Sequence, residues 1–345
     1  MAINQVSQKQ ENTVLDVQNV TKIFHSRGRT TVALQGVSFS VGTGKIVALV
    51  GESGSGKTTI ARIITGIEKP SEGDVTLGSW RVSSLRAKQL REYRRSVQMV
   101  FQDPFSSLNP HHSVMNTIVR PLMNHLHLSK SEAMKRAMEI MSTVRLAPIE
   151  QFANKKPHEL SGGQRQRLVI ARAIAPEPAV IVADEPVSML DVSIRADILY
   201  LIDELRKRTD MSVLYITHDL YSARATADEV VVLYKGHVVE QGDIKQVVRE
   251  PQHPYTQLLL EAIPNPRTKA DSHSLREPVK KLAPSILQIN EGAARNRKDM
   301  PVQGQMGGCP FAPRCSIRIQ QCLEENPALL GKTNHRVACW QRSVD

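Results

Sequence analysis

The sequence has no apolar run long enough to cross a bilayer. A membrane-spanning helix needs about 18 or more apolar residues, whereas the longest apolar runs here are short segments such as 179–183 and 230–234. The first residues, 1–13, are polar and lack the apolar core of a secretory signal. We therefore expect a chain without membrane spans that is made and kept in the cytosol.

Cysteine is scarce, and all four cysteines of the 345-residue chain follow Gly308. A reducing cytosol argues against disulfides between them. Their clustering in one short tail therefore requires another explanation.

The chain also lacks a concentrated run of one charge, although its net charge is +11. Basic residues are spread along the sequence, and the densest group, 86–95, has the spacing of a solvated helix face. The hydrophobic content of 41% and the charged content of 23% are ordinary for a soluble globular protein. We therefore attribute the charge to solubility and expect no nucleic acid partner.

The stretch Gly51–Thr59 has the sequence of a phosphate-binding loop. An apolar run, 45–50, precedes it and a helical pattern, 60–65, follows, which is the context that the pattern GxxxxGK[ST] requires. Small residues let backbone N–H groups surround a phosphate, and the helix N-terminus adds its dipole. We predict that the lysine binds the β- and γ-phosphates of ATP and that the next threonine binds Mg²⁺. The predicted nucleotide-binding residues are Gly51, Ser53, Gly54, Gly56, Lys57, Thr58 and Thr59.

Polar residues stand at the ends of three other predicted strands, namely Gln102, Asp184 with Glu185, and His218. Strands that alternate with helices predict an α/β fold with a mostly parallel sheet, in which these strand ends meet at one edge. We expect Asp184 to hold Mg²⁺ together with Thr58 and Gln102. Glu185 is the expected catalytic base for the attacking water, which Gln102 and His218 would help to position.

Leu160–Gln164 is a second candidate anion site, because a serine and two glycines stand at the start of a predicted helix. One ATP needs one such cradle, so a second cradle indicates that the chain serves another subunit's nucleotide. We therefore predict a head-to-tail pair of ATPase chains with ATP at their interface. The residues concerned are Ser161, Gly162, Gly163 and Gln164.

In this combination the motifs resemble the ATP-binding subunit of an ABC transporter, over about residues 15–262. The resemblance implies a P-loop NTPase fold with a mostly parallel core sheet, an antiparallel β subdomain and a helical subdomain. It also assigns Asp191 to the D-loop at the nucleotide and Phe24 to stacking on adenine. The family's other motifs match 51–58 (Walker A), Gln102 (Q-loop), 160–164 (signature), 180–184 (Walker B), Glu185 (catalytic glutamate) and His218 (switch histidine).

A finer resemblance is to the dipeptide, oligopeptide and nickel importer branch, carried by 101–110, 253–256 and 308–315. It implies an importer subunit, most specifically for di- or oligopeptides, at the cytoplasmic face of the cell membrane. The implied partners are a second ATPase subunit, identical or different, two transmembrane permease subunits and an extracytoplasmic substrate-binding protein.

The expected domain limits follow from a change in composition after Ala262. We expect an ATP-binding domain over 1–262, with its helical subdomain at about 103–162. Residues 263–308 are rich in Pro, Lys, Arg and Ser and predict a linker or extension. A small cysteine-containing lobe is expected over 309–345.

The cysteines Cys309, Cys315, Cys322 and Cys339 have the spacing C-x₅-C-x₆-C-x₁₆-C. Four thiolates suit a [4Fe–4S] cluster, and the resembling branch includes members that carry one in this extension. Zn²⁺ is an alternative, although structural zinc sites usually begin with closer pairs, and His335 could replace one ligand. Free thiols are the third alternative.

Two other functions compete with the importer subunit. A soluble ABC-type ATPase acting on DNA would carry long coiled coils between the Walker A loop and the signature, but only about a hundred residues without heptads separate them here. One acting on the ribosome would carry two cassettes, and this chain has no internal repeat. A metabolic P-loop kinase would lack the signature.

Overall fold

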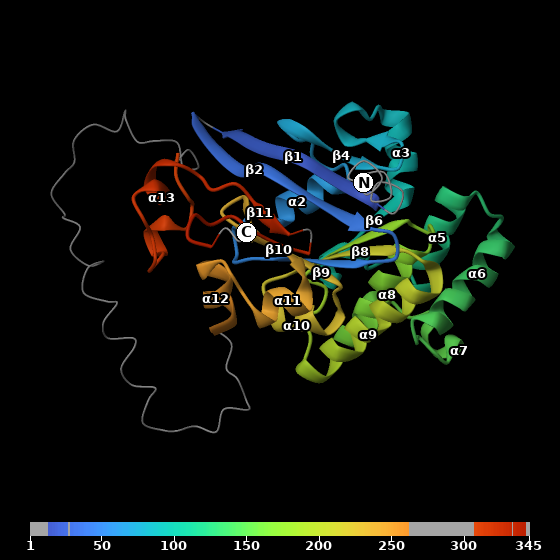
Figure 1. The fold of residues 1–345 in the computed structure, drawn as a ribbon. Helices are drawn as coiled ribbons and strands as arrows, with labels where there is room; N and C mark the ends of the chain where they lie inside the picture. Colours follow the sequence, from blue (N-terminus) through green and yellow to red (C-terminus); the bar gives the residue numbers. More distant parts are fainter. Residues whose placement is uncertain (1–12, 27, 262–306, 333, 343–345) are drawn as a thin grey trace, which may run out of the picture.

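Two β-sheets form the centre of the computed structural model, which describes residues 13–26, 28–261, 307–332 and 334–342 (Figure 1). In this described part the larger sheet has eight strands in the order β11-β12-β10-β9-β3-β8-β7-β6. Neighbours from β9 to β6 are parallel, whereas β10, β12 and β11 are antiparallel. The strands are β3 (Ile46–Val50), β6 (Val97–Val100), β7 (Val180–Asp184), β8 (Ser212–Thr217), β9 (Glu229–Tyr234), β10 (His237–Asp243), β11 (Leu330–Lys332) and β12 (His335–Val337).

The smaller sheet is antiparallel and lies against one face of the larger one (Figure 1). Its strands are β1 (Thr13–Ser26), β2 (Arg29–Gly42), β4 (Glu72–Leu77) and β5 (Trp80–Arg81). The helices are α2 (Lys57–Ile64), α3 (Ala87–Ser96), α4 (Pro104–Ser107), α5 (Val114–Leu126), α6 (Lys130–Thr143), α7 (Ile149–Phe152), α8 (Gly162–Ile174), α9 (Val192–Thr209), α10 (Leu220–Thr226), α11 (Ile244–Arg249), α12 (Pro254–Glu261) and α13 (Gln321–Glu324). Short 3₁₀ helices cover Val82–Ser84, Pro157–Glu159 and Ala312–Arg314.

Strand β3 shows why the central strands are continuous apolar runs. Ile46, Ala48 and Val50 pack into a core shared with α5, α6 and α8 to α11. Val47 and Leu49 face the opposite way, into a core shared with α2, α3 and the smaller sheet. All five residues are buried, as expected for parallel strands covered on both faces. The predicted fold class is confirmed.

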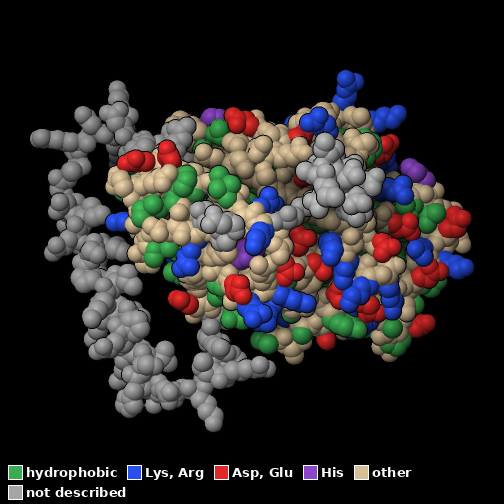
Figure 2. Space-filling model, in the orientation of Figure 1, with side chains coloured by type: hydrophobic (Ala, Val, Ile, Leu, Met, Phe, Trp, Pro, Cys, Tyr) green, Lys and Arg blue, Asp and Glu red, His purple; other side chains and the backbone are tan. Residues whose placement is uncertain are grey.

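The charged side chains are mixed on the face drawn in Figure 2, where Lys and Arg alternate with Asp and Glu over the helices. Ion pairs of this kind include Arg145–Glu204 and Arg208–Glu204. On this face, therefore, side chains of both signs lie close together.

The C-terminal part, residues 307–342, joins the sheet of the rest of the chain. Strand β12 pairs with β10, with Glu240 opposite Val337 and Gly242 opposite His335. Phe311 is buried in the same core as the central helices. This part therefore shares both sheet and core with the preceding residues, while the domain limits stay predictions because 262–306 lie outside the described residues.

A buried polar cluster joins the C-terminal part to α12. Glu240 is fully buried and accepts hydrogen bonds from the backbone N–H groups of Gln252 and His253, and its Oε1 lies 2.6 Å from His335 Nε2. The Nδ1 of His253 accepts from the backbone N–H of Tyr255, 3.1 Å away. Desolvation by burial lowers the pKa of His253 to about 4, despite an opposing effect of Glu240.

From the lowered pKa of His253 we predict that the protein loses stability in mild acid. The folded protein favours the neutral ring of His253. The contribution of this group to the stability is therefore fully present above the unfolded pKa of about 6.5, and it is lost as the pH falls from there toward about 4. Between pH 7.5 and 5 the free energy of unfolding should fall by about 2 kcal/mol from this group. His253→Asn can accept the same hydrogen bond without titrating, so its loss should be smaller.

Urea unfolding of each protein at the two pH values measures the difference. His158→Asn is the matched control, because His158 is exposed, and it should keep the wild-type pH dependence. An unchanged pH dependence in His253→Asn would contradict the assignment.

Candidate functional site

The predicted phosphate loop and the predicted catalytic residues stand at one edge of the parallel sheet. The loop 51–56 joins β3 to α2, Gln102 follows β6, Asp184 ends β7 and His218 follows β8. Adjacent parallel strands place these segments side by side. The strand ends named in the sequence analysis therefore lie together, as expected for a doubly wound sheet.

Glycine is required at two positions of the phosphate loop. A Cβ on Gly51 would lie 2.2 Å from the carbonyl oxygen of Leu233. Gly56 has φ +108°, and a Cβ there would lie 2.8 Å from the carbonyl oxygen of Ala33. The loop therefore packs directly on neighbouring backbone, which fixes its path into α2.

Lys57 turns back over this loop at the start of α2. Its side chain is buried, and its Nζ donates to the carbonyl oxygens of Gly51 and Glu52 at 2.7 and 2.9 Å. Burial lowers the pKa of Lys57, while the charges of Glu185 and Asp184 oppose that shift. The hydroxyl of Ser55 is buried without a hydrogen-bond partner in the described part of the chain. A cation and an unsatisfied hydroxyl in the loop at the start of a helix fit a phosphate.

Thr58 and Asp184 offer the oxygen donors that Mg²⁺ prefers. The Oγ1 of Thr58 lies 3.4 Å from Oδ2 of Asp184, so the two groups converge. Burial raises the pKa of Asp184, and the negative charge of Glu185 raises it further. A bound cation would favour the ionised carboxylate, so these residues fit Mg²⁺.

Glu185 lies between the two other predicted catalytic side chains. Its Oε2 accepts a hydrogen bond from Gln102 Nε2 at 3.1 Å, and its Oε1 lies 3.3 Å from Nδ1 of His218. Its backbone has φ +45°, in the left-handed region, and its N–H donates to the carbonyl of Ile216. Strain of this kind persists where surrounding structure holds a functional side chain in place.

The second predicted cradle is the N-terminus of α8. Ser161 Oγ accepts from the backbone N–H of Gln164, and the side chain of Gln164 accepts from the N–H of Ser161. A Cβ on Gly163 would lie 2.9 Å from Cγ2 of Ile194, so the helix start packs closely on α9. Among the described residues no hydrogen bond or ion pair joins this cradle to the phosphate loop.

Asp191 and Phe24 lie outside the central group. Asp191 precedes α9 and is exposed. Phe24 on β1 is 37% exposed, with Nζ of Lys22 4.9 Å from the ring centroid. The roles of both residues at the nucleotide stay predictions.

The cysteines do not form a metal site in the described residues, where no group of three or more His, Cys, Asp or Glu side chains could hold a metal ion. The backbones of Cys309 and Cys322 are hydrogen-bonded, but all four thiols are free. Desolvation by burial raises the pKa of the Cys309 and Cys339 thiols, and the neighbouring Cys315 and Cys322 raise it further. His335 is engaged with Glu240. The structure therefore does not support the predicted [4Fe–4S] cluster or its zinc alternative.

Three residues near the phosphate loop were missed by the sequence interpretation of the site. Glu52 is contacted by Tyr255, whose Oη accepts from its backbone N–H, and by Arg314, whose guanidinium pairs with its carboxylate. Tyr255 and Arg314 both lie in segments that carry the finer family resemblance. The family resemblance therefore singled out both segments in the sequence, but it did not indicate that Tyr255 and Arg314 contact Glu52.

Comparison with known proteins agrees with this geometry. A family profile described as ABC transporter matches residues 34–188, and one described as oligopeptide/dipeptide transporter, C-terminal region, matches residues 239–322. A putative peptide import ATP-binding protein of Brucella ovis is 38% identical over 335 residues, covering 97% of this chain and 99% of the relative. The oligopeptide transport ATP-binding protein OppF of Salmonella typhimurium is 37% identical, covering 94% and 92%.

Solved structures are similar over the nucleotide-binding part. The dimeric post-hydrolysis state of the cassette MJ0796 bound to ADP and Pi has a TM-score of 0.60 and 33% identity, covering 67% of this chain and 98% of that chain. The cbiO1 subunit from Clostridium perfringens has a TM-score of 0.62 and 30% identity, covering 69% and 92%. No helix in the described ranges is long and apolar enough to span a membrane. By full-length similarity and by the family profiles, the chain belongs to the ABC transporter ATP-binding proteins, which are ATPases coupled to transport.

Proposed function

We propose that this chain is the ATP-hydrolysing subunit of a membrane importer for oligopeptides or dipeptides. The observation that carries the catalytic part is the contact of Glu185 with both Gln102 and His218 at the sheet edge that also bears Lys57. The transported substrate is supported by the C-terminal family profile and by the names of relatives that cover nearly the whole chain. A soluble ATPase acting on DNA or the ribosome has no comparable support.

The proposed chemistry divides the work among the side chains of the site. Lys57 and the backbone N–H groups of its loop bind the β- and γ-phosphates, while Thr58, Asp184 and Gln102 hold Mg²⁺. When bound, Mg²⁺ neutralises phosphate charge in the transition state. Glu185 accepts the proton of the attacking water, and His218 orients that carboxylate through the 3.3 Å contact.

The proposed assembly is a head-to-tail dimer of ATPase subunits. The cradle Ser161–Gln164 is separate from the chain's own phosphate loop, which supports a role at the partner's nucleotide. One solved relative is itself a dimeric cassette. We further propose two permease subunits, an extracytoplasmic substrate-binding protein and a peripheral place at the cytoplasmic membrane face, because both named relatives are import or transport subunits.

The Glu185→Gln variant should bind ATP normally but lose turnover by about 10²–10⁴-fold, because the amide cannot accept the proton of water. The neighbouring Asp184→Asn is the matched comparison, since it should instead weaken the Mg²⁺ dependence of ATP binding. Steady-state ATPase rates of the assembled transporter and ATP titrations with and without Mg²⁺ separate the two. Normal turnover in Glu185→Gln would contradict its role as the base.

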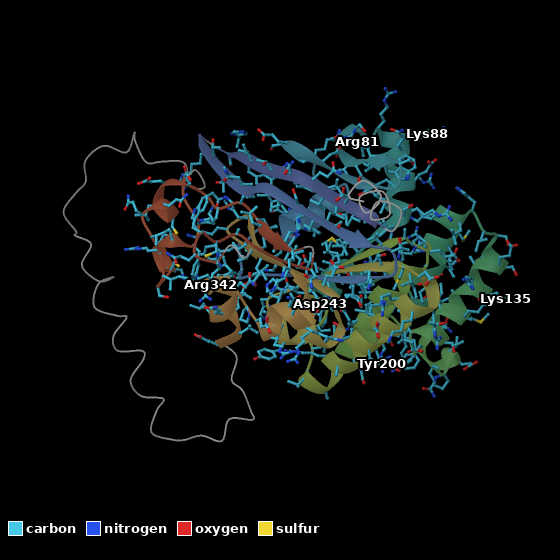
Figure 3. The ribbon with its side chains drawn as sticks, viewed as in Figure 1. Arg81, Lys88, Lys135, Tyr200, Asp243 and Arg342 are labelled. Carbon is cyan, nitrogen blue, oxygen red and sulfur yellow. The ribbon has the colours of Figure 1, made fainter. Side chains whose placement is uncertain are left out.

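The Lys57→Ala variant should weaken ATP binding itself, because it removes the cation closest to the β- and γ-phosphates. Lys88→Ala is the control, since Lys88 on α3 projects into solvent (Figure 3). Titration calorimetry on the full-length chain measures both dissociation constants. Equal ATP affinity in Lys57→Ala and the wild type would refute the assignment of the phosphate site.

The Ser161→Arg variant should prevent the ATP-dependent dimer, because it places a bulky cation in the backbone cradle. Ser129→Arg is its matched control, since Ser129 caps α6 with the same reciprocal bonding to Glu132 but lies on another helix. Size-exclusion chromatography with ATP and Mg²⁺, in the Glu185→Gln background and with the partner ATPase present, measures dimer formation. Loss of the dimer in both variants would show a general effect of the lost cap, and dimer formation by Ser161→Arg would refute the shared site.

A further inference from the structure

Glu52, the second residue of the phosphate loop, is held at three of its groups. Its backbone N–H donates to Oη of Tyr255 at 2.8 Å. Its carbonyl oxygen accepts from Nζ of Lys57 at 2.9 Å and from the N–H of Ser55 at 3.2 Å. Its carboxylate pairs with the guanidinium of Arg314. No other residue of the loop has its N–H, its carbonyl and its side chain all engaged among the described contacts.

The carbonyl of Glu52 couples this residue to phosphate binding. It positions the amino group of Lys57 and, through the N–H of Ser55, the next turn of the loop. A movement of Glu52 would therefore displace both the cation and the backbone donors that surround a phosphate. A residue outside the loop that fixes the position of Glu52 therefore also fixes the positions of the Lys57 amino group and of these backbone donors.

Tyr255 holds Glu52 from α12. Its ring is fully buried and lies 4.5 Å, centroid to centroid, from the ring of Tyr234 at the end of β9. Its own N–H donates to Nδ1 of the buried His253. The hydroxyl is therefore presented to Glu52 by a side chain with no freedom to move away.

Arg314 holds Glu52 from the C-terminal part. Its Nη1 lies 3.2 and 3.0 Å from the two carboxylate oxygens, and its Nη2 lies 3.3 Å from Oε1. Arg314 ends a 3₁₀ turn whose neighbour, Phe311, is buried against the rings of Tyr234 and Tyr255 at 5.3 and 5.7 Å. The guanidinium also lies 5.7 Å from the ring centroid of Phe311, so the aromatic cluster fixes the turn that carries it.

We propose that the C-terminal part of the chain sets the affinity of the phosphate loop for ATP by holding Glu52, with Arg314 and Tyr255 as positioning residues. Neither residue is assigned a contact with the nucleotide. The proposal rests on ATP binding by the cassette and is independent of the identity of the transported substrate.

The test compares Arg314→Gln and Tyr255→Phe in the full-length chain. The side chains of Arg314 and Glu52 are 43% and 42% exposed. An ion pair this exposed is weak, so Arg314→Gln should raise the ATP dissociation constant only about threefold. Tyr255→Phe leaves the N–H of Glu52 without its acceptor and should raise it about tenfold. In both variants, amide hydrogen exchange of residues 51–58 should be faster before any nucleotide is added.

Three further comparisons distinguish the positioning of Glu52 from a general effect of net charge. Arg314→Lys keeps the charge without the paired geometry and should give an intermediate affinity. Glu52→Gln combined with Arg314→Gln should bind ATP no more weakly than Glu52→Gln alone, because the two residues act as one pair. Arg318→Gln is the matched control, since Arg318 is an exposed arginine of the same segment without an ion pair to any described residue.

Faster exchange together with weaker ATP binding in both main variants would support the proposal. Unchanged exchange and affinity in Arg314→Gln and Tyr255→Phe would overturn it. An equal loss of affinity in Arg318→Gln would also overturn it, since the effect would then come from net charge. Additive losses in the double variant would exclude the Glu52–Arg314 pair as the cause.

Discussion

Parallel strand pairing is the constraint on which the site depends. Strands β6, β7, β8 and β3 are held in one parallel register, so the segments that leave them meet at a single edge. Residues as distant in sequence as Gln102, Glu185 and His218 are thereby within contact of one another. Parallel strands of this kind must be covered on both faces, and here each face packs into a separate hydrophobic core.

The site residues at the ends of these strands could be predicted because each of them follows a short apolar run. The rule that strand ends meet is general, so no knowledge of distances was needed to bring Asp184, Glu185 and His218 to the phosphate loop. The local pattern around Ser161 was equally informative, since a serine followed by two glycines and a glutamine forms its own cap. The proposed contact of that cap with another subunit depends on assembly and not on the fold of a single chain.

Other features could not be predicted because they depend on contacts between distant segments. Arg314 and Glu52 are 262 positions apart, and Tyr255 and Glu52 are 203 apart. No periodicity or spacing links such residues. The cysteines were predicted to hold a cluster from their spacing and from a family resemblance, and no metal-holding group is found among the described residues.

The separation between Glu52 and Arg314 also bears on how the protein is made. A ribosome adds roughly 5–20 residues per second, so Glu52 is incorporated about 13–52 s before Arg314, which lies 262 positions further along the chain. Strand β12, which pairs with β10 on the antiparallel side of the main sheet, is made later still. Strand β3 meets its partners β8 and β9 only after residues 212–234 are made, and the contacts that hold Glu52 from outside the loop form later still, when synthesis is nearly complete.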